Sequence, residues 1–219
     1  MLSGMIVLNF LAFLLLLINM SKILLKRQAE AILPTDWGKF RIVAYARRTD
    51  DPLPHLALIH ENFDANNTPI LLRIHSECMT GDVFHSLRCD CGEQLDFAMS
   101  KAAETGGVVI YLRQEGRGIG LINKLKAYQL QDKGYNTAEA NLHLGFEADE
   151  RIYDDAITII KDLNISKINI LTNNPLKIKA LEDSGIEVIK RLPIIIEPKV
   201  ENEFYLHTKR DLMGHLLHL

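Results

Sequence analysis

The chain has 219 residues, of which 47% are hydrophobic and 24% are charged, and its formal net charge is −3. This balance is typical of a globular domain with a hydrophobic core, and it excludes the large basic surface on which bulk binding of nucleic acid depends. The chain has only three cysteines. That low, odd number argues against a secreted disulfide scaffold and favours a reducing, cytoplasmic setting in which thiols stay free and can hold a metal.

The chain opens with an apolar extension, since residues 5–18 read "MIVLNFLAFLLLLI". A membrane anchor needs about 20 apolar residues, and the basic residues from Lys22 onward would then face the cytosol. A signal peptide needs a basic region before the run and a small-residue cleavage site, and neither is evident. We favour a third interpretation, in which translation begins at Met20. Residues 1–19 are then an extension, and residues 20–219 form one domain.

Hydrophobic patterns predict alternating strands and helices after this extension. Strands are expected at residues 39–46, 55–61, 70–77, 108–112 and 167–174. Helices are expected at residues 95–102, 121–134, 149–163 and 175–185, the last one beginning at Pro175. This order predicts a single α/β domain with a mixed β-sheet and flanking helices, in which the first strands are antiparallel.

All three cysteines lie in the stretch "HSECMTGDVFHSLRCDCG", residues 75–92. One interpretation is that they are small buried hydrophobic side chains, because free cysteine is among the most buried residue types. In an extended strand, however, Cys89 and Cys91 would point to opposite faces, and their polar neighbours do not suit a buried strand. A bend permitted by Gly92 would bring both sulfurs to one point. Three thiolates at one point favour a zinc site.

The number of zinc ligands decides the kind of site. Three protein ligands leave a fourth position for water, which is typical of catalytic zinc because the metal lowers the pKa of that water toward neutrality. His75 or His85 could instead complete the coordination shell and make the site structural. The sequence leaves both alternatives open.

A glycine-rich stretch, "RQEGRGIG" at residues 113–120, lies between a predicted buried strand and a helix. Backbone N–H groups and two arginines there suit an anion such as phosphate. The pattern matches neither a P-loop nor a dinucleotide fingerprint. The alternative is an ordinary left-handed turn with solvated arginines.

Two further stretches carry polar residues at element ends. In "GFEADERIYDD" Asp149 is either a functional group or a helix N-cap, with Arg151 pairing with Asp155 one turn on. In "LTNNP" Thr172 and Lys177 are placed to meet a ligand at the carboxyl end of a strand, and the alternative is an Asx turn before a helix.

Taken together, these stretches resemble the GTP cyclohydrolase II family. The resemblance rests on "RIHSECMTGDVFHSLRCDCG", "RQEGRGIGLINKLKAYQLQDKGYNT", "LGFEADERIY", "LTNNPLKI" and "NEFYLHTKRDLMGHLL", which occur in this order and span residues 20–217. It implies a GTP cyclohydrolase II-like fold in a monofunctional protein. The implied activity is conversion of GTP to formate, pyrophosphate and 2,5-diamino-6-(5-phosphoribosylamino)pyrimidin-4(3H)-one, the first committed step of riboflavin biosynthesis.

The resemblance also implies roles for particular residues. Zn²⁺ would be held by Cys78, Cys89 and Cys91, and Mg²⁺ would accompany the triphosphate. The positions implied to contact GTP are Arg73, Ile74, His75, Ser76, Glu77, Gln94, Glu115, Gly116, Arg117, Thr137, Thr172 and Lys177. Asp149 would be the proton acceptor, Arg151 the nucleophile, and Tyr128 a residue of the ring-opening step. A homodimer is implied as well.

Two of these roles have alternatives. A guanidinium has a pKa above about 12 and a delocalised lone pair, so Arg151 can instead clamp the α-phosphate electrostatically while Asp149 orients it. Tyr128 lies three residues after Leu125 on a predicted helix and can instead be part of the core.

The competing functions are a zinc-dependent nucleic-acid or regulatory binding module and a family member that only binds. The net charge of −3 disfavours the first, and the presence of all the matched reactive residues disfavours the second. We therefore expect an enzyme that acts on GTP, with no nucleic-acid partner and no membrane partner unless residues 1–19 are a true anchor.

Overall fold

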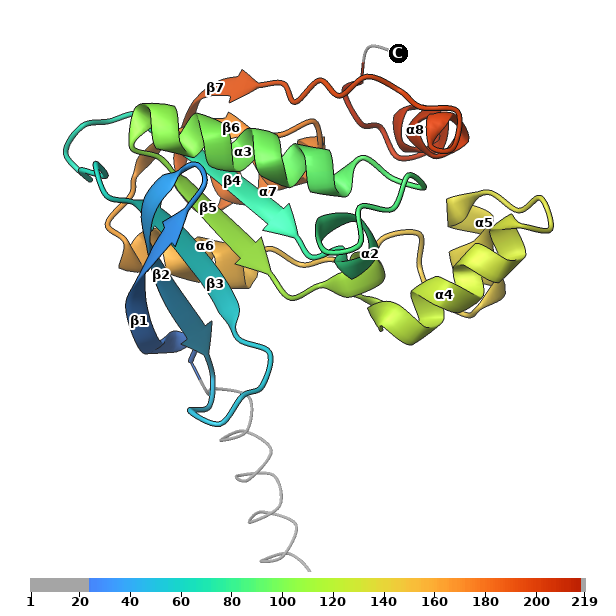
Figure 1. The fold of residues 1–219 in the computed structure, drawn as a ribbon, viewed down its shortest axis with the longest axis horizontal. Coiled ribbons are helices and arrows are strands. Elements are labelled where there is room, and N and C mark those ends of the chain that lie inside the picture. The colour runs from blue at the N-terminus through green and yellow to red at the C-terminus, as the bar shows by residue number, and fades with distance from the viewer. Residues whose placement is uncertain (1–23, 218–219) are drawn as a thin grey trace, which may run out of the picture.

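The computed structural model describes residues 24–217, so the predicted extension at residues 1–19 lies outside the described residues. Its centre is a seven-stranded sheet in the order β1-β2-β3-β5-β4-β6-β7 (Figure 1). The strands are β1 (Lys26–Thr35), β2 (Gly38–Ala46), β3 (His55–His60), β4 (Ile70–Ser76), β5 (Val108–Leu112), β6 (Lys167–Leu171) and β7 (Glu187–Leu192). The helices are α2 (Met79–Asp82), α3 (Cys91–Thr105), the 3-10 helix η1 (Glu115–Gly118), α4 (Gly120–Gln131), α5 (Thr137–His143), α6 (Asp154–Asp162), α7 (Pro175–Asp183) and α8 (Glu203–Asp211).

The sheet is mixed, as the sequence predicts. Strands β1, β2, β3 and β5 pair antiparallel, whereas β5, β4, β6 and β7 are parallel. The first strand predicted from the sequence begins at residue 39, so β1 was not predicted. Nearly every residue of β1 is exposed, so its sequence "KRQAEAILPT" lacks the alternation that marks a strand with one buried face.

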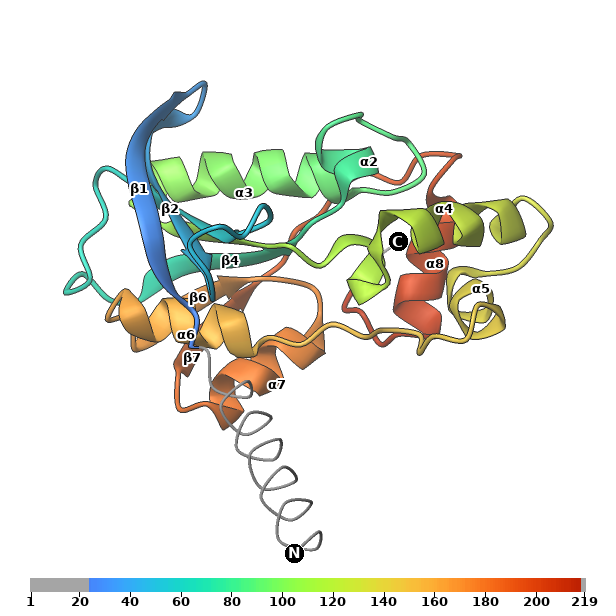
Figure 2. The ribbon, with the colours of Figure 1, turned by 90° about the horizontal axis from the view of Figure 1, so that it is seen from below.

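Helices cover both faces of the sheet, with α3 on one side and α6 on the other (Figure 2). Ala98, Met99 and Ala102 of α3 pack with Val109 of β5. On the opposite face, Ile159 and Ile160 of α6 pack in a second cluster with buried strand residues. One of these is Ile110 of β5, which directly follows Val109. Neighbouring residues of one strand thus enter different clusters, as the pleat requires. Each fully buried Ile stabilises the fold by about 1.5–3 kcal/mol relative to exposure.

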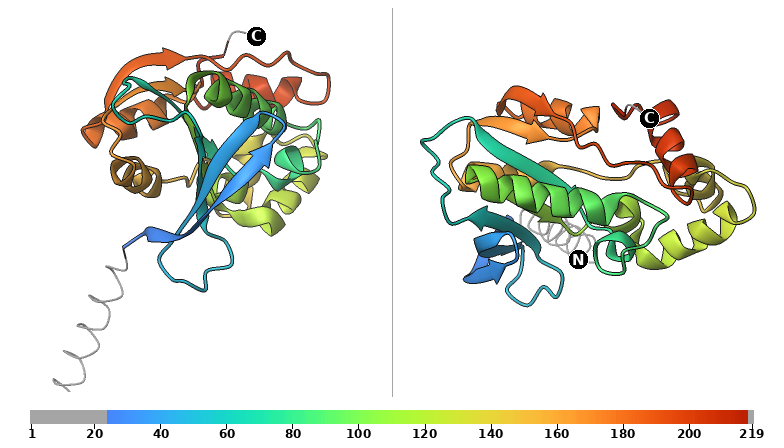
Figure 3. Two further views of the ribbon diagram at one scale, coloured as in Figure 1. Left: turned by 60° about the vertical axis from the view of Figure 1, so that its left-hand side comes forward. Right: turned by 45° about the horizontal axis from the view of Figure 1, so that its top comes forward.

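The parallel strands end at the same edge of the sheet. There β4 ends at Ser76, β5 at Leu112 and β6 at Leu171. Helices α2, α4, α5 and α8 gather beyond this edge (Figures 1 and 3). Ligands of open α/β sheets bind at the carboxyl ends of strands, so this edge is where a site is expected.

The helix pattern was predicted in part. Helices α3, α4 and α7 lie where the sequence places them, and Pro175 is at the first turn of α7. Helix α6 begins at Asp154, not at residue 149. Helices α5 and α8 were not predicted, because their sequences carry few apolar residues at helical spacing. No helix within residues 24–217 combines the length and the apolar character needed to cross a membrane.

Candidate active site

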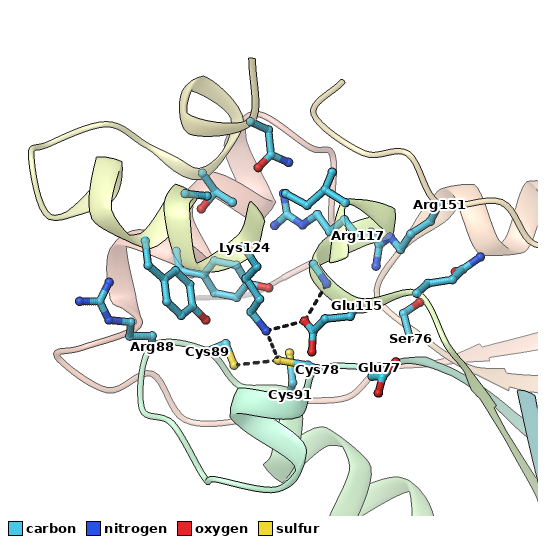
Figure 4. Close-up of a pocket in the computed structure, with 18 of the residues that line it drawn as sticks. Ser76, Glu77, Cys78, Arg88, Cys89, Cys91, Glu115, Arg117, Lys124 and Arg151 are labelled. Atoms are coloured by element: carbon cyan, nitrogen blue, oxygen red, sulfur yellow. Dashed lines mark hydrogen bonds and ion pairs between the residues drawn. The ribbon is translucent and has the colours of Figure 1, made fainter. Parts of the chain in front are cut away.

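Two adjoining cavities lie at the carboxyl edge of the parallel strands. The metal cavity has a volume of about 680 Å³ and is lined by the three cysteines, Glu115, Lys124 and Tyr128 among others (Figure 4). The polar cavity has a volume of about 520 Å³ and is lined mainly by cationic and amide side chains. Residues that line both cavities are Ser76, Cys91, Arg117, Arg151 and Tyr205. The two cavities therefore share one wall.

The three cysteine sulfurs converge as the sequence predicts. Their Sγ atoms lie within 4.8 Å of one another, and those of Cys78 and Cys89 are 3.6 Å apart. Tetrahedral Zn–S bonds of about 2.3 Å separate two sulfurs by about 3.8 Å, so the cluster fits a zinc ion. Within residues 24–217 it is the only group of three or more potential metal ligands of this kind. The interpretation of the cysteines as mere core residues does not explain this convergence.

Neither histidine joins the sulfurs. The His75 Nε2 atom lies 3.0 Å from one carboxylate oxygen of Asp82, and the other oxygen accepts a hydrogen bond from the backbone N–H of Cys78 at 2.9 Å. His85 is not part of the metal-ligand group either. The group of potential metal ligands in the described residues thus consists of the three cysteines alone, which is the set that the first alternative requires.

Two glycines allow the cysteine segments to pack closely. Cys78 precedes α2, and Cys91 is the first residue of α3, so the start of this helix makes the predicted bend. A Cβ atom on Gly92 would collide with the backbone carbonyl of Gly81. A Cβ atom on Gly81 would lie 2.9 Å from the Cys89 Sγ. The glycines are therefore required by close packing and not by an unusual backbone angle.

Lys124 of α4 reaches the cysteine cluster. Its Nζ donates to the Cys78 Sγ at 3.0 Å and to Glu115 at 2.8 Å (Figure 4). Hydrogen bonds from Cys89 and Cys91, and then Lys124, lower the pKa of Cys78, whereas the bond to Cys78 raises the pKa of Cys89 to about 11. The cluster thus already favours one thiolate. Sequence reasoning missed Lys124, although it lies one turn before Tyr128 and hence on the same face of the helix.

Tyr128 lines the metal cavity. Its hydroxyl lies 3.3 Å from the Thr80 Oγ1, and the Arg88 guanidinium lies 4.9 Å from the centre of its ring. Leu125, which the sequence placed on the same buried face, is 47% exposed. The buried positions of α4 are Lys124 and Ala127. The alternative in which Tyr128 packs with Leu125 in a core is therefore wrong.

The polar cavity is unusually rich in buried cations. Arg73 donates to the Leu171 carbonyl at 3.1 Å and to Gln94 at 2.8 Å. Lys177 donates to the Ile74 carbonyl at 2.8 Å. Burial, reinforced by the charge of Arg73, holds the pKa of Lys177 well below its usual range, and burial lowers the pKa of Arg73 to about 10. Such a cavity has a strong electrostatic preference for an anion.

The glycine-rich stretch forms η1, with Gly116 and Arg117 at φ values of 62° and 64°. This left-handed turn was one of the two alternatives. The same alternative expected the two arginines to be solvated, and this part of it is wrong. The Arg113 guanidinium forms an ion pair with the Glu77 carboxylate, with an N–O distance of 2.7 Å. Both terminal nitrogens of Arg117 are buried, and they find no hydrogen-bond partner among the described residues. An anion between the two cavities would supply the missing acceptors.

Asp149 and Arg151 form a buried ion pair. The Arg151 Nε donates to Asp149 at 2.8 Å, and a second, parallel bond makes the pair bidentate. Burial lowers the pKa of Arg151, but the hydrogen bond to Asp149, together with the Coulombic effects of Asp149 and two nearby tyrosines, outweighs burial, and the net pKa is raised. The helix-cap interpretation is wrong, because the N-cap of α6 is Tyr153. Arg151 does not pair with Asp155, whose partners are Arg47 and His55.

The other predicted site residues are distributed around the same cavities. Those lining the metal cavity are Ser76, Glu77, Glu115, Gly116, Arg117 and Thr137. Those lining the polar cavity are Arg73, His75, Gln94, Thr172 and Lys177. Ile74 differs, since its side chain lies in the core and only its carbonyl reaches Lys177. Asn174 makes the expected Asx turn, accepting from the Leu176 N–H at 2.9 Å, while Thr172 and Lys177 line the polar cavity.

A cluster of three thiols suited to a metal ion, beside a cationic cavity, is typical of a metalloenzyme that acts on an anionic substrate. A family model described as GTP cyclohydrolase II matches residues 26–193. A GTP cyclohydrolase-2 of Buchnera aphidicola subsp. Schizaphis graminum is 55% identical over 189 residues, which are 86% of this chain and 95% of that protein. A GTP cyclohydrolase-2 of Escherichia coli O45:K1 is 50% identical over 88% of this chain and 98% of its own length.

A second kind of relative is matched over part of its length. The riboflavin biosynthesis protein RibBA of Bacillus velezensis is 50% identical over 196 residues, which are 89% of this chain but 49% of that protein. The chain belongs to the GTP cyclohydrolase II family, and the relatives named GTP cyclohydrolase-2 are matched over nearly their whole length.

Proposed function

We propose that this protein is a zinc-dependent GTP cyclohydrolase II. It hydrolyses GTP to formate, pyrophosphate and 2,5-diamino-6-(5-phosphoribosylamino)pyrimidin-4(3H)-one, the first committed step of riboflavin biosynthesis. The observation that carries the proposal is the shared wall of the two cavities. A nucleoside triphosphate can place its base beside the cysteines and its phosphates among the cations at the same time.

We assign the metal to Cys78, Cys89 and Cys91, whose spacing and chemistry fit zinc. When bound there, zinc supplies an activated water near neutral pH for opening the imidazole ring and removing its carbon. The ammonium group of Lys124 offsets the negative charge of the cysteines. It is held by an ion pair with Glu115, in which Nζ and the carboxylate oxygen are 2.8 Å apart. The hydroxyl of Tyr128 faces the same cavity and is proposed to move a proton in the ring-opening step.

The polar cavity is assigned to the triphosphate. Arg73, Arg117, Lys177 and Arg151 line it, and burial, followed by the charges of Arg73 and Arg151, lowers the pKa of Lys177. A triphosphate would offset the repulsion among these cations and favour the charged form of Lys177. We propose that Mg²⁺ enters with the phosphates, because Mg²⁺ prefers oxygen ligands and keeps several of its waters.

For Arg151 we favour the electrostatic role over the covalent one. A nucleophilic guanidinium must first lose a proton, and the bidentate Asp149 carboxylate makes that loss harder because it raises the pKa of Arg151. The same carboxylate fixes the plane of the guanidinium and turns it toward both cavities. Arg151 is thus proposed to bind the α-phosphate and the charge that develops as pyrophosphate leaves.

One assay tests the function. Purified protein is incubated with GTP, Zn²⁺ and Mg²⁺, and formate and pyrophosphate are both quantified. We expect the two products in equal amounts. Cys89→Ser should lose zinc and formate release, whereas Arg151→Ala should lose pyrophosphate release and keep its zinc. Neither product from a zinc-loaded, folded wild-type protein would refute the function, and normal pyrophosphate release by Arg151→Ala would refute the phosphate role.

The remaining assignments rest on the family resemblance. They are the contacts of the other matched residues with GTP, a homodimer and a cytoplasmic location. Light scattering of the purified protein tests the dimer, and a mass of one chain at micromolar concentration would contradict it.

A further inference from the structure

Helix α8 and the residues after it form a wall of the site. These residues lie beyond residue 193, where the match to the family model ends. In space α8 lies beside α5, beyond the carboxyl edge of the parallel strands (Figure 2). Tyr205 of α8 lines both cavities, and Lys209 and His215 line the polar one. The carboxyl-terminal segment is therefore part of the site, although it is far in sequence from the cysteines.

Two separate contacts hold this segment in place. The Lys209 Nζ donates to Asp90 at 3.0 Å, and both side chains are buried. Asp90 lies between the two cysteines of "CDCG" and precedes α3. Farther on, the Leu216 N–H donates to the Asn173 carbonyl at 2.8 Å, next to the end of β6. A buried ion pair and a backbone hydrogen bond thus fix α8 against two separate parts of the domain.

The ring of Tyr205 lies close to two cations. The Arg117 guanidinium is 5.7 Å from the centre of the ring, and the Lys209 ammonium is 5.0 Å from it. Both distances are within the range of cation–π attraction. Arg117 comes from η1, where its backbone takes a left-handed φ of 64°, and both of its terminal nitrogens are buried without an acceptor. The ring of Tyr205 thus contacts the Arg117 guanidinium through its face. This contact leaves the hydrogen-bond donors of Arg117 unused.

We propose that Tyr205 is a positioning residue for the GTP reaction. Its ring holds Arg117 at the junction of the two cavities, with the guanidinium nitrogens left free for phosphate oxygens of the substrate. This inference rests on the proposed function and adds a residue of the carboxyl-terminal segment to it. A carboxylate in place of the ring would hold Arg117 as firmly, but it would occupy the donors that the substrate needs.

The test compares three variants for GTP turnover. In Tyr205→Leu the ring is lost, and we expect the KM for GTP to rise about 3- to 30-fold, the size of one partly desolvated cation–π contact. Tyr205→Phe keeps the ring and should recover most of that loss. Phe204→Leu is the matched control, because Phe204 is the neighbouring aromatic residue of α8 and is 62% exposed. Melting temperature and zinc content are measured for each protein.

A double-mutant cycle separates positioning from a merely structural role. If Tyr205 acts through Arg117, Tyr205→Leu should change KM little further in an Arg117→Gln background. Additive effects, or a Tyr205→Leu protein with the KM of wild type, would overturn the inference.

Calorimetric titration with inorganic tripolyphosphate gives a readout that does not need turnover. Weaker binding by Tyr205→Leu, with unchanged binding by Phe204→Leu, supports the inference even if GTP is not the substrate. Equal binding by all the proteins contradicts it. Failure of the wild-type protein to turn over GTP counts against the proposed function alone.

Discussion

Replacing Lys124 by methionine should weaken zinc binding. The substitution keeps most of the length of the side chain and removes only its charge and its donors. Lys124 is buried, and its Nζ lies 3.0 Å from the Cys78 Sγ and 2.8 Å from Glu115. A zinc ion with three thiolates carries a net charge of −1, which this ammonium offsets. Without the ammonium group of Lys124, the negative charges of the metal centre and of the Glu115 carboxylate would repel each other with no cation between them.

The magnitude follows from these distances. Two unit charges 3 Å apart attract each other by about 5 kcal/mol at an effective dielectric constant near 20. Most of this is cancelled, because burying the ammonium costs several kcal/mol and the negative charge is spread over the cluster. Loss of an outer partner of a metal ligand typically lowers metal affinity about 10- to 100-fold. We therefore expect the zinc dissociation constant of Lys124→Met to rise by that factor, equivalent to about 1.4–2.7 kcal/mol.

Competition with a chromophoric chelator measures the zinc affinity directly and does not depend on activity. Lys126→Met is the matched control, because Lys126 is exposed on the same helix and its Nζ makes a long hydrogen bond, of 3.4 Å, to Asn123. It should keep the affinity of wild type. A folded Lys124→Met protein with the same zinc affinity as the Lys126→Met protein would refute the charge argument.

Three further predictions concern other parts of the chain. Tyr128→Phe should lower formate release with little change in melting temperature, and unchanged release would remove the hydroxyl from the reaction. His55 and Arg47 lower the pKa of Asp155 from 3.8 to about 2, so its contribution to stability is complete above the higher value and lost as the pH falls toward the lower one. The difference in free energy of unfolding between wild type and Asp155→Asn should therefore shrink over this window in urea titrations, and a constant difference would contradict the assignment. A protein comprising residues 20–219 should fold and turn over GTP like the full chain, whereas a misfolded truncation would contradict the predicted domain boundary.

The sequence predicted those elements whose burial leaves a pattern. The continuous apolar run of β5 and the spaced apolar residues of α3 and α6 are direct consequences of packing on the sheet. Strand β1 and helix α8 leave much weaker patterns, since β1 is largely exposed and α8 buries Thr208 and Lys209 beside Leu206. A buried lysine looks like a surface residue in the sequence, because only the distant partner, here Asp90, explains its burial.

The site was predicted to a similar extent and for a related reason. The cysteines could be found because three soft ligands close in sequence are rare, and Thr172 and Lys177 because they follow the end of a buried strand. Lys124 and Tyr205 could not, since each acquires its role from a partner on another element, Cys78 and Arg117 respectively. The resemblance to a family supplied positions such as Thr137 that no local pattern marks.

The charges of the two cavities explain why the two hydrolytic steps should respond to different substitutions. The metal cavity holds thiols and a carboxylate with Lys124 as their buried cation, so it suits a positive ion and an activated water. The polar cavity holds Arg73 and Lys177 with lowered pKa values, so it suits a polyanion. Arg117 and Arg151 stand in the wall between them. Because Asp149 already neutralises Arg151 while Arg117 has no acceptor among the described residues, an incoming phosphate gains more from Arg117. Loss of Arg117 should consequently weaken substrate binding first, whereas loss of Arg151 should slow the departure of pyrophosphate.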